Sequence, residues 1–180
     1  WFTDSTCKTA YSTTTNIVPT RSGYTFRGFF ASDLSDVTAD DNTATAYLNK
    51  SGASTTSGTN WIVNTDKTIY AAWAASCQAP STGTCTLTVS DGGAVDYTGG
   101  CNTGYTLGAS NTYKPTCTAN KYEITLNGNS ATTAGTTKLY TTFATGVYTD
   151  SGRSTAMSTT ANGITVPQRK YTVTYNANGG

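Results

Sequence analysis

Three observations predict an all-β fold with little or no helix. Threonine makes up roughly a quarter of the chain, far above its ordinary share, and β-branched residues favour strands. Twelve tyrosines accompany only five phenylalanines, which suits strands with one partly wet face, because tyrosine joins an apolar ring to a polar tip. Apolar and polar residues also alternate over short runs, with little sign of helical spacing.

A segment near the start of the chain is repeated near its end. The matching positions are Thr3-Asp4-Ser5 with Thr149-Asp150-Ser151, Thr9-Ala10 with Thr155-Ala156, and Pro19 and Arg21 with Pro167 and Arg169. Self-similarity over such a span indicates an array of like modules. Arrays of this kind act mostly as spacers or as binding surfaces.

A first module is expected over residues 1–75. Its central strand should cover Tyr24–Phe30, where Phe29 interrupts the alternation and indicates a bulge. A short strand is expected over Thr45–Leu48. The closing strand should cover Thr68–Trp73, with its core face formed by Ile69, Ala71 and Trp73.

Residues 76–119 are expected to form a separate module, because they hold four of the five cysteines. A hairpin with a three-residue loop at 91–93 would set Val89 opposite Val95 and Cys85 opposite Gly99. A bulge at Gly99-Gly100 would then bring Cys101 across from Cys85. That geometry predicts a Cys85–Cys101 disulfide, since bonded cysteines have Cα atoms ~5.5 Å apart.

Residues 120–180 are expected to form a module of the first kind. Its strands should cover Tyr122–Leu126, Leu139–Phe143 and Gly146–Thr149, followed by the repeated Thr-Asp-Ser segment. It ends in a further strand, Tyr171-Thr172-Val173-Thr174-Tyr175, which leads into the turn residues 176–180.

Several of these motifs together resemble the internalin-type β-repeat, also called the Listeria–Bacteroides repeat. The residues that carry the resemblance are Pro19, Arg21, Gly23, Tyr24, Thr25, Phe26, Gly28 and Phe29, then Thr65, Asp66, Thr68, Ile69, Tyr70, Ala71 and Trp73, and the opening Y-T-V-T-Y-N-A-N-G-G at 171–180. The resemblance implies tandem β-grasp-like modules in a bacterial surface protein. It departs from the family pattern because the opening strand lies at the end of the chain, and the module at the start lacks one.

The stretch from Val95 to Cys117 resembles, over about 25 residues, the middle of a complement-control (sushi) module. In that family the first cysteine pairs with the third, so the resemblance implies a Cys77–Cys117 disulfide. The family's tryptophan and final cysteine are missing from this chain.

Composition excludes several classes of function. The chain has no histidine, a net charge of +1 and a single glutamate, Glu123. The usual general base is therefore absent, and we expect no enzyme and no cofactor. The near-neutral charge gives no electrostatic basis for binding nucleic acid or acidic membranes. Cysteines without histidine or C-x-x-C spacing favour disulfides over zinc, which indicates an oxidising, extracellular location.

Four weaker candidates accompany this interpretation. Clustered loop carboxylates offer hard oxygen ligands for calcium, namely Asp33, Asp36, Asp40 and Asp41. Aromatic rings that sugars stack on would be those of Trp1, Trp61, Trp73 and the tyrosines. Intramolecular isopeptide cross-links would join Lys8, Lys121 or Lys138 to nearby asparagines, assisted by Glu123 or an aspartate. A formal glycosylation sequon is present at Asn49-Lys50-Ser51.

The sequence therefore favours a structural repeat segment of an extracellular bacterial adhesin, stalk or fibre, assembled head-to-tail with neighbouring units through Tyr171–Tyr175. The odd cysteine, Cys7, is expected to bond a cysteine outside this chain. A glycan-binding module of a secreted protein and an accessory domain of a larger surface enzyme are the alternatives. Possible partners beyond the array are a surface protein or a glycan.

Overall fold

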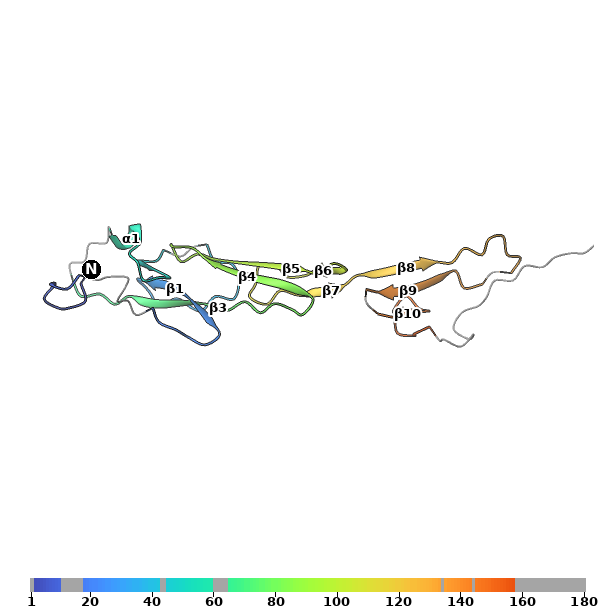
Figure 1. Ribbon diagram of the computed structural model, residues 1–180, viewed down its shortest axis with the longest axis horizontal. Helices are drawn as coiled ribbons and strands as arrows, with labels where there is room; N and C mark the ends of the chain where they lie inside the picture. Colours follow the sequence, from blue (N-terminus) through green and yellow to red (C-terminus); the bar gives the residue numbers. More distant parts are fainter. Residues whose placement is uncertain are drawn as a thin grey trace, which may run out of the picture. The chain divides into compact units, whose positions relative to one another are not determined.

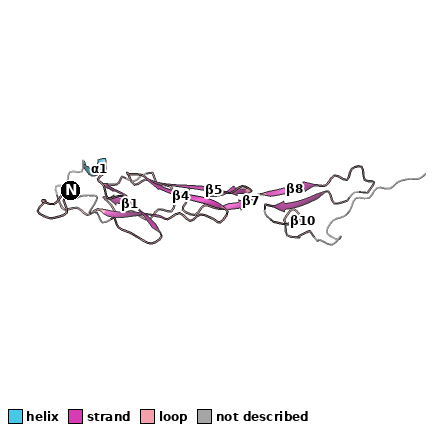
Figure 2. Cartoon of the chain, in the orientation of Figure 1, coloured by secondary structure: helices cyan, strands magenta, loops and turns pink. Residues whose placement is uncertain are grey.

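The computed structural model describes residues 2–10, 18–42, 45–59, 65–133, 135–143 and 145–157. These residues are nearly all β, in several small antiparallel sheets (Figure 2), as the sequence predicts. The single helix among them is the four-residue α1, Thr56–Thr59. The chain divides into two compact units, Trp1–Thr118 and Ala119–Gly180.

The first sheet of the first unit has β1, Tyr24–Phe30, at its centre. β2, Leu48–Asn49, pairs antiparallel with one edge of β1. β3, Tyr70–Ala75, pairs antiparallel with its other edge (Figure 1). The register of β1 against β3 shifts between Phe26 and Gly28. The expected bulge therefore exists, but it lies at Arg27 rather than at Phe29, and it buries Phe26, Arg27 and Gly28 in succession.

In the closing strand β3, the residues that face the core differ from the predicted Ile69, Ala71 and Trp73. Ala72 and Ala74 are its buried residues, whereas Ala71 and Trp73 are half-buried. Ala74 packs in a cluster with Val89, Val95 and Tyr97 of the following hairpin. The predicted core face was wrong because the hairpin covers the alanine face of the strand. Trp73 instead packs against the ring of Phe26, with 5.5 Å between the ring centroids.

The hairpin consists of β4, Gly83–Val89, and β5, Val95–Cys101. Val89 pairs with Val95, Leu87 with Tyr97 and Cys85 with Gly99, which is the register that the sequence predicts. β6, Tyr105–Leu107, and β7, Cys117–Ala119, form a further two-stranded sheet.

The boundary expected at residue 75 does not separate two cores. Tyr97, which is 1% exposed, donates its hydroxyl hydrogen to the carbonyl of Ala75 at 2.6 Å. Val95 also exchanges backbone hydrogen bonds with Asp41 at 2.8 and 3.0 Å. The Cys-rich hairpin and the first sheet therefore share one core within the first unit.

The four cysteines of this region are disulfide-bonded, but in pairs that differ from both predictions. The bonds join Cys77 to Cys85 and Cys101 to Cys117, with Cα–Cα distances of 5.7 and 5.8 Å. These pairs replace the predicted Cys85–Cys101 and Cys77–Cys117 bonds.

The physical reason is the regular register of the hairpin. No bulge shifts Gly99 and Gly100, so Cys101 lies opposite Gly83 and not opposite Cys85. Gly83 has no side chain, and a Cβ built on it would come within 2.7 Å of the Cys117 sulfur. The glycine thus leaves the space in which Cys117 approaches β5 and bonds Cys101.

The second unit contains one described sheet, in the order β10-β9-β8. Its strands are β8, Lys121–Thr125, β9, Lys138–Thr142, and β10, Val147–Tyr148. The turn after β8 is closed by the Asn127 side chain, which accepts the amide hydrogen of Asn129 at 2.9 Å. All three strands lie where the sequence predicts them, within one or two residues.

Candidate functional site

A loop organised by Asp4 lies in the first unit. Its carboxylate accepts the amide hydrogens of Thr6 at 2.9 Å, Lys8 at 3.3 Å and Thr9 at 2.6 Å, and also a hydrogen bond from the Thr6 hydroxyl. The Thr3 amide donates to the Thr9 carbonyl at 2.9 Å and closes the loop. One aspartate therefore satisfies the backbone amide donors of a short segment whose residues are mostly exposed to solvent.

The Asp150 loop of the second unit has the same construction. Its carboxylate accepts the amide hydrogens of Thr155 at 2.6 Å and Ser154 at 3.1 Å. The Thr149 amide donates to the Thr155 carbonyl at 3.0 Å. Even the strained position is shared, because Cys7 and its counterpart Arg153 both have a positive φ, 54° and 59°.

The hydrogen bonds lower the pKa values of both carboxyl groups. Asp4 has its pKa lowered from the ordinary value, first by the Thr6 hydroxyl and then by the Thr9 amide. Asp150 has its pKa lowered to about 2, chiefly by the Thr155 and Ser154 amides. Since these carboxylates are occupied by their own loops, we interpret them as structural groups.

Besides the two aspartate loops, the first unit has a buried charged side chain, that of Arg27 in the bulge of β1. It is 0% exposed. Its Nη2 contacts the Asp41 carboxylate at 2.7 Å, and its Nε donates to the Gly93 carbonyl at 2.9 Å. Nη1 is buried and has no hydrogen-bond partner among the residues that the structure describes. The sequence patterns did not single out Arg27, although the interrupted alternation of β1 was a signal that could have identified it.

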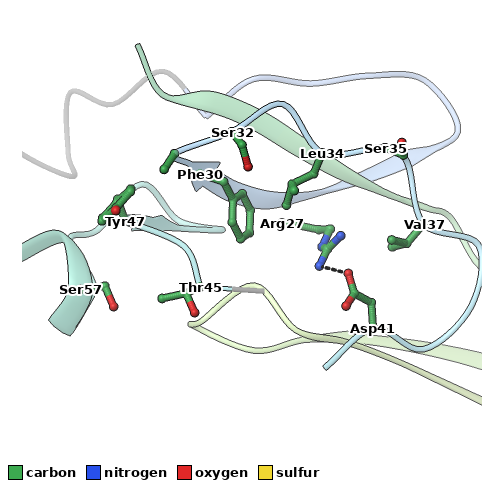
Figure 3. A pocket seen from close by; sticks show the side chains of 11 residues that line it. Arg27, Phe30, Ser32, Leu34, Ser35, Val37, Asp41, Thr45, Tyr47 and Ser57 are labelled. Atoms are coloured by element: carbon green, nitrogen blue, oxygen red, sulfur yellow. Dashed lines mark hydrogen bonds and ion pairs between the residues drawn. The ribbon is translucent and has the colours of Figure 1, made fainter. Parts of the chain in front are cut away.

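A cavity of about 560 Å³ lies over Arg27 and Phe30 (Figure 3). Its wall combines apolar and hydroxyl-bearing side chains from β1, from the loop that follows it and from α1. The remaining lining residues are Ala31, Ser32, Leu34, Ser35, Val37, Asp41, Thr45, Tyr47 and Ser57. All of these residues belong to the first unit.

The carboxylates proposed for calcium are not brought together. Asp36 pairs with Arg21 at 2.7 Å, Asp41 pairs with Arg27 at 2.7 Å, and Asp40 accepts the Tyr97 amide hydrogen at 2.7 Å. Across the described ranges, no three metal-ligating side chains converge. The calcium candidate formed by Asp33, Asp36, Asp40 and Asp41 is therefore corrected: Asp36, Asp40 and Asp41 bind Arg21, the Tyr97 amide and the buried Arg27 instead.

The residues predicted from the sequence for sugar stacking and for an isopeptide bond lie as follows. Trp1 and Trp61 lie outside the described residues, and Trp73 is half-buried against Phe26. Lys138 and Glu123 form an ion pair at 2.9 Å on neighbouring strands, with both side chains about half exposed rather than in the buried setting that an isopeptide bond requires.

The sequon asparagine, Asn49, is 9% exposed, and its carbonyl oxygen accepts from Ser51 and Ala53. It is a turn-forming side chain, which does not suit a glycosylation site. Cys7 is exposed and is the one free cysteine among the residues that the structure describes. The strand expected at Tyr171–Tyr175 lies outside the described residues.

Comparison with family models, curated proteins and solved structures found no match for this chain. The resemblance to internalin-type repeats thus depends on the sequence motifs alone. The described residues contain no helix long and apolar enough to cross a membrane. The two disulfides indicate an oxidising, extracellular or secreted environment.

Proposed function

We propose that this chain is a structural repeat segment that spaces or displays other parts of an extracellular surface protein. The observation that carries the proposal is the recurrence of one loop in both compact units, in which Asp4 and Asp150 each accept the amide hydrogens of the fourth and fifth residues that follow. Repeat proteins reuse a local structural solution in this way, because each module must stabilise the same segment. No catalytic step belongs to this role, in a chain without histidine.

The two units would be related modules of a β-grasp-like array, of the bacterial kind that the resemblance implies. A second sequence match supports tandem organisation. Lys121-Tyr122, Ile124-Thr125, Asn127 and Asn129, in and after β8, match Lys170-Tyr171, Val173-Thr174, Asn176 and Asn178. Because β8 pairs with β9 through this sequence, the segment Tyr171–Tyr175 would open a further module by the same pairing.

Head-to-tail continuation follows from that pairing, either along one polypeptide or between subunits. An edge strand with unpaired N–H and C=O groups is a strong site for adding another strand. Cys7 supports covalent contact with a neighbour, because it is exposed at the tip of the Asp4 loop, where the matching loop has Arg153. We propose that Cys7 bonds a cysteine of an adjacent segment or subunit.

Surface display tests the proposed role. Arrays of this chain in increasing copy number would be placed between a cell anchor and a fluorescent tag, and energy transfer from a membrane dye would report the distance of the tag. A spacer predicts that transfer falls with each added copy, and more steeply than with Gly/Ser linkers of equal length, which behave as coils. Transfer that does not change with copy number would refute the spacer role.

A further inference from the structure

The cavity over Arg27 has the chemistry of a ligand site. Placing a guanidinium in a buried position without an acceptor for one nitrogen is costly, because the lost hydration is not replaced. Nη1 of Arg27 is such a nitrogen among the described residues, and Arg27 lines the cavity. An acceptor that enters the cavity would remove this cost, so the site gains free energy from a ligand that supplies one.

The charge of the site selects a neutral ligand. Asp41 already balances the guanidinium through Nη2, at 2.7 Å. An anion bound to Nη1 would bring a second negative charge close to the Asp41 carboxylate, and like charges in contact disfavour binding. A neutral hydroxyl group avoids that repulsion, since it accepts from Nη1 and can donate to a carboxylate or to another hydroxyl.

The wall of the cavity matches a ligand with both apolar and hydroxyl-bearing faces. Phe30, Leu34 and Val37 supply the apolar surface. Hydroxyl groups are supplied by Ser32, Ser35, Thr45, Tyr47 and Ser57 (Figure 3). Ligand sites typically combine an apolar lining with a few polar groups, and about 560 Å³ lies within their usual size range.

We propose that this cavity binds one or two sugar residues of a neutral glycan, with a sugar hydroxyl accepting a hydrogen bond from Arg27 Nη1. The Asp41 carboxylate and the lining hydroxyls would orient the other sugar hydroxyls. Because Arg27 is fully buried, a lining side chain must shift as the sugar enters. Leu34 has room to do so, since it is half-buried and its neighbours Asp33 and Ser35 are exposed. This site is independent of the spacer role.

The test uses the oxidised full chain and free glucose, galactose, mannose and N-acetylglucosamine. Saturation-transfer NMR would detect binding at concentrations on the order of tens of millimolar, above the weak end of single-site affinities. Amide shifts would then locate the site and give the affinity of the sugar that binds best. We expect the shifts to centre on Arg27, Thr45 and Ser57.

Two variants and one control test whether the sugar binds in the cavity over Arg27. Ser32→Trp fills the cavity from an exposed position, and the matched control Ser81→Trp places the same side chain on an exposed turn outside it. Arg27→Lys keeps a positive charge beside Asp41 and removes the guanidinium nitrogens. R27K should weaken binding at least about tenfold, the loss expected for a hydrogen bond from a charged donor. S32W should weaken it at least as much, because the indole ring occupies the cavity, and S81W should not change it.

S32W alone remains decisive if R27K fails to fold, because Ser32 is exposed and contributes little to the core. Three results would overturn the proposal: no sugar binds, S32W leaves sugar binding unchanged, or acetate or phosphate binds at the cavity more tightly than any of the sugars. The last result would assign the site to anions.

Discussion

Asp4 and Asp150 hold equivalent loops in separate units of the chain, each accepting the amide hydrogen of the threonine five residues later at 2.6 Å. The loops also share a backbone bond between the flanking threonines and a bridge, Phe2 to Ala10 in one and Tyr148 to Ala156 in the other. The pair therefore links the internal sequence repeat to a physical element.

The pH dependence of the Asp150 loop follows from its hydrogen bonds. Its carboxyl pKa is lowered from 3.8 to about 2, so the ionised form stabilises the loop fully above the ordinary value. That contribution is lost as the pH falls from 3.8 through about 2. We expect the carboxyl carbon of Asp150 to titrate near the lower value by NMR, with the protection factor of the Thr155 amide against hydrogen exchange falling over the same range. A midpoint near 4 would contradict the loop geometry.

The disulfide pairing can be checked without reduction. Cleavage of the denatured, unreduced chain before Asp91 and Asp96 cuts between Cys85 and Cys101. With Cys77–Cys85 and Cys101–Cys117 bonded, the flanking fragments should separate in mass spectrometry before any reductant is added. Either of the other two pairings would keep those fragments joined until reduction.

Gly83 should tolerate no side chain. A Cβ at this position would lie 2.2 Å from the Gly100 carbonyl and 2.7 Å from the Cys117 sulfur. Gly83→Ala should destabilise the first unit by about 1–3 kcal/mol, the usual effect of overpacking, in denaturant unfolding. The control is Gly146→Ala, because a Cβ there meets nothing within 4 Å. Equal effects of the two substitutions would show that the strands are not this close at Gly83.

The hydroxyl of Tyr97 should stabilise the first unit by joining the hairpin to the first sheet. Tyr97→Phe leaves the ring in place and leaves the Ala75 carbonyl without its donor, which typically costs about 1–3 kcal/mol. Tyr70→Phe, at a position in β3 of the first sheet that is 40% exposed, is the control and should have almost no effect. A neutral Y97F variant would mean that the hairpin and sheet do not share this contact.

The hairpin shows how far the sequence could predict the structure. Its register follows from local alternation and a short Gly-rich loop, so Val89 opposite Val95 was predictable. The cysteine pairing was not, because Gly99-Gly100 also suggests a bulge. Gly99 is needed for a different reason: a Cβ there would lie 2.6 Å from Pro115, which packs from a later part of the chain. Local patterns do not contain that long-range contact.

Arg27 illustrates the same limit at the candidate site. A charged residue in a strand is ordinarily expected to face solvent. Its burial depends on Asp41, 14 residues away, and on the Gly93 carbonyl, 66 residues away. The sequence indicated an irregularity in β1, but only the fold brings these partners to the arginine. The cavity above it was unpredictable for the same reason.

The central claim, that this chain is a spacing module, is tested most directly by small-angle scattering of one, two and three copies joined in tandem. An array predicts a maximum dimension that rises in proportion to copy number, about threefold from one copy to three. Copies that collapse into a single globule would instead raise both the radius of gyration and the maximum dimension only about 1.5-fold. The first result would support the proposed function, and the second would contradict it.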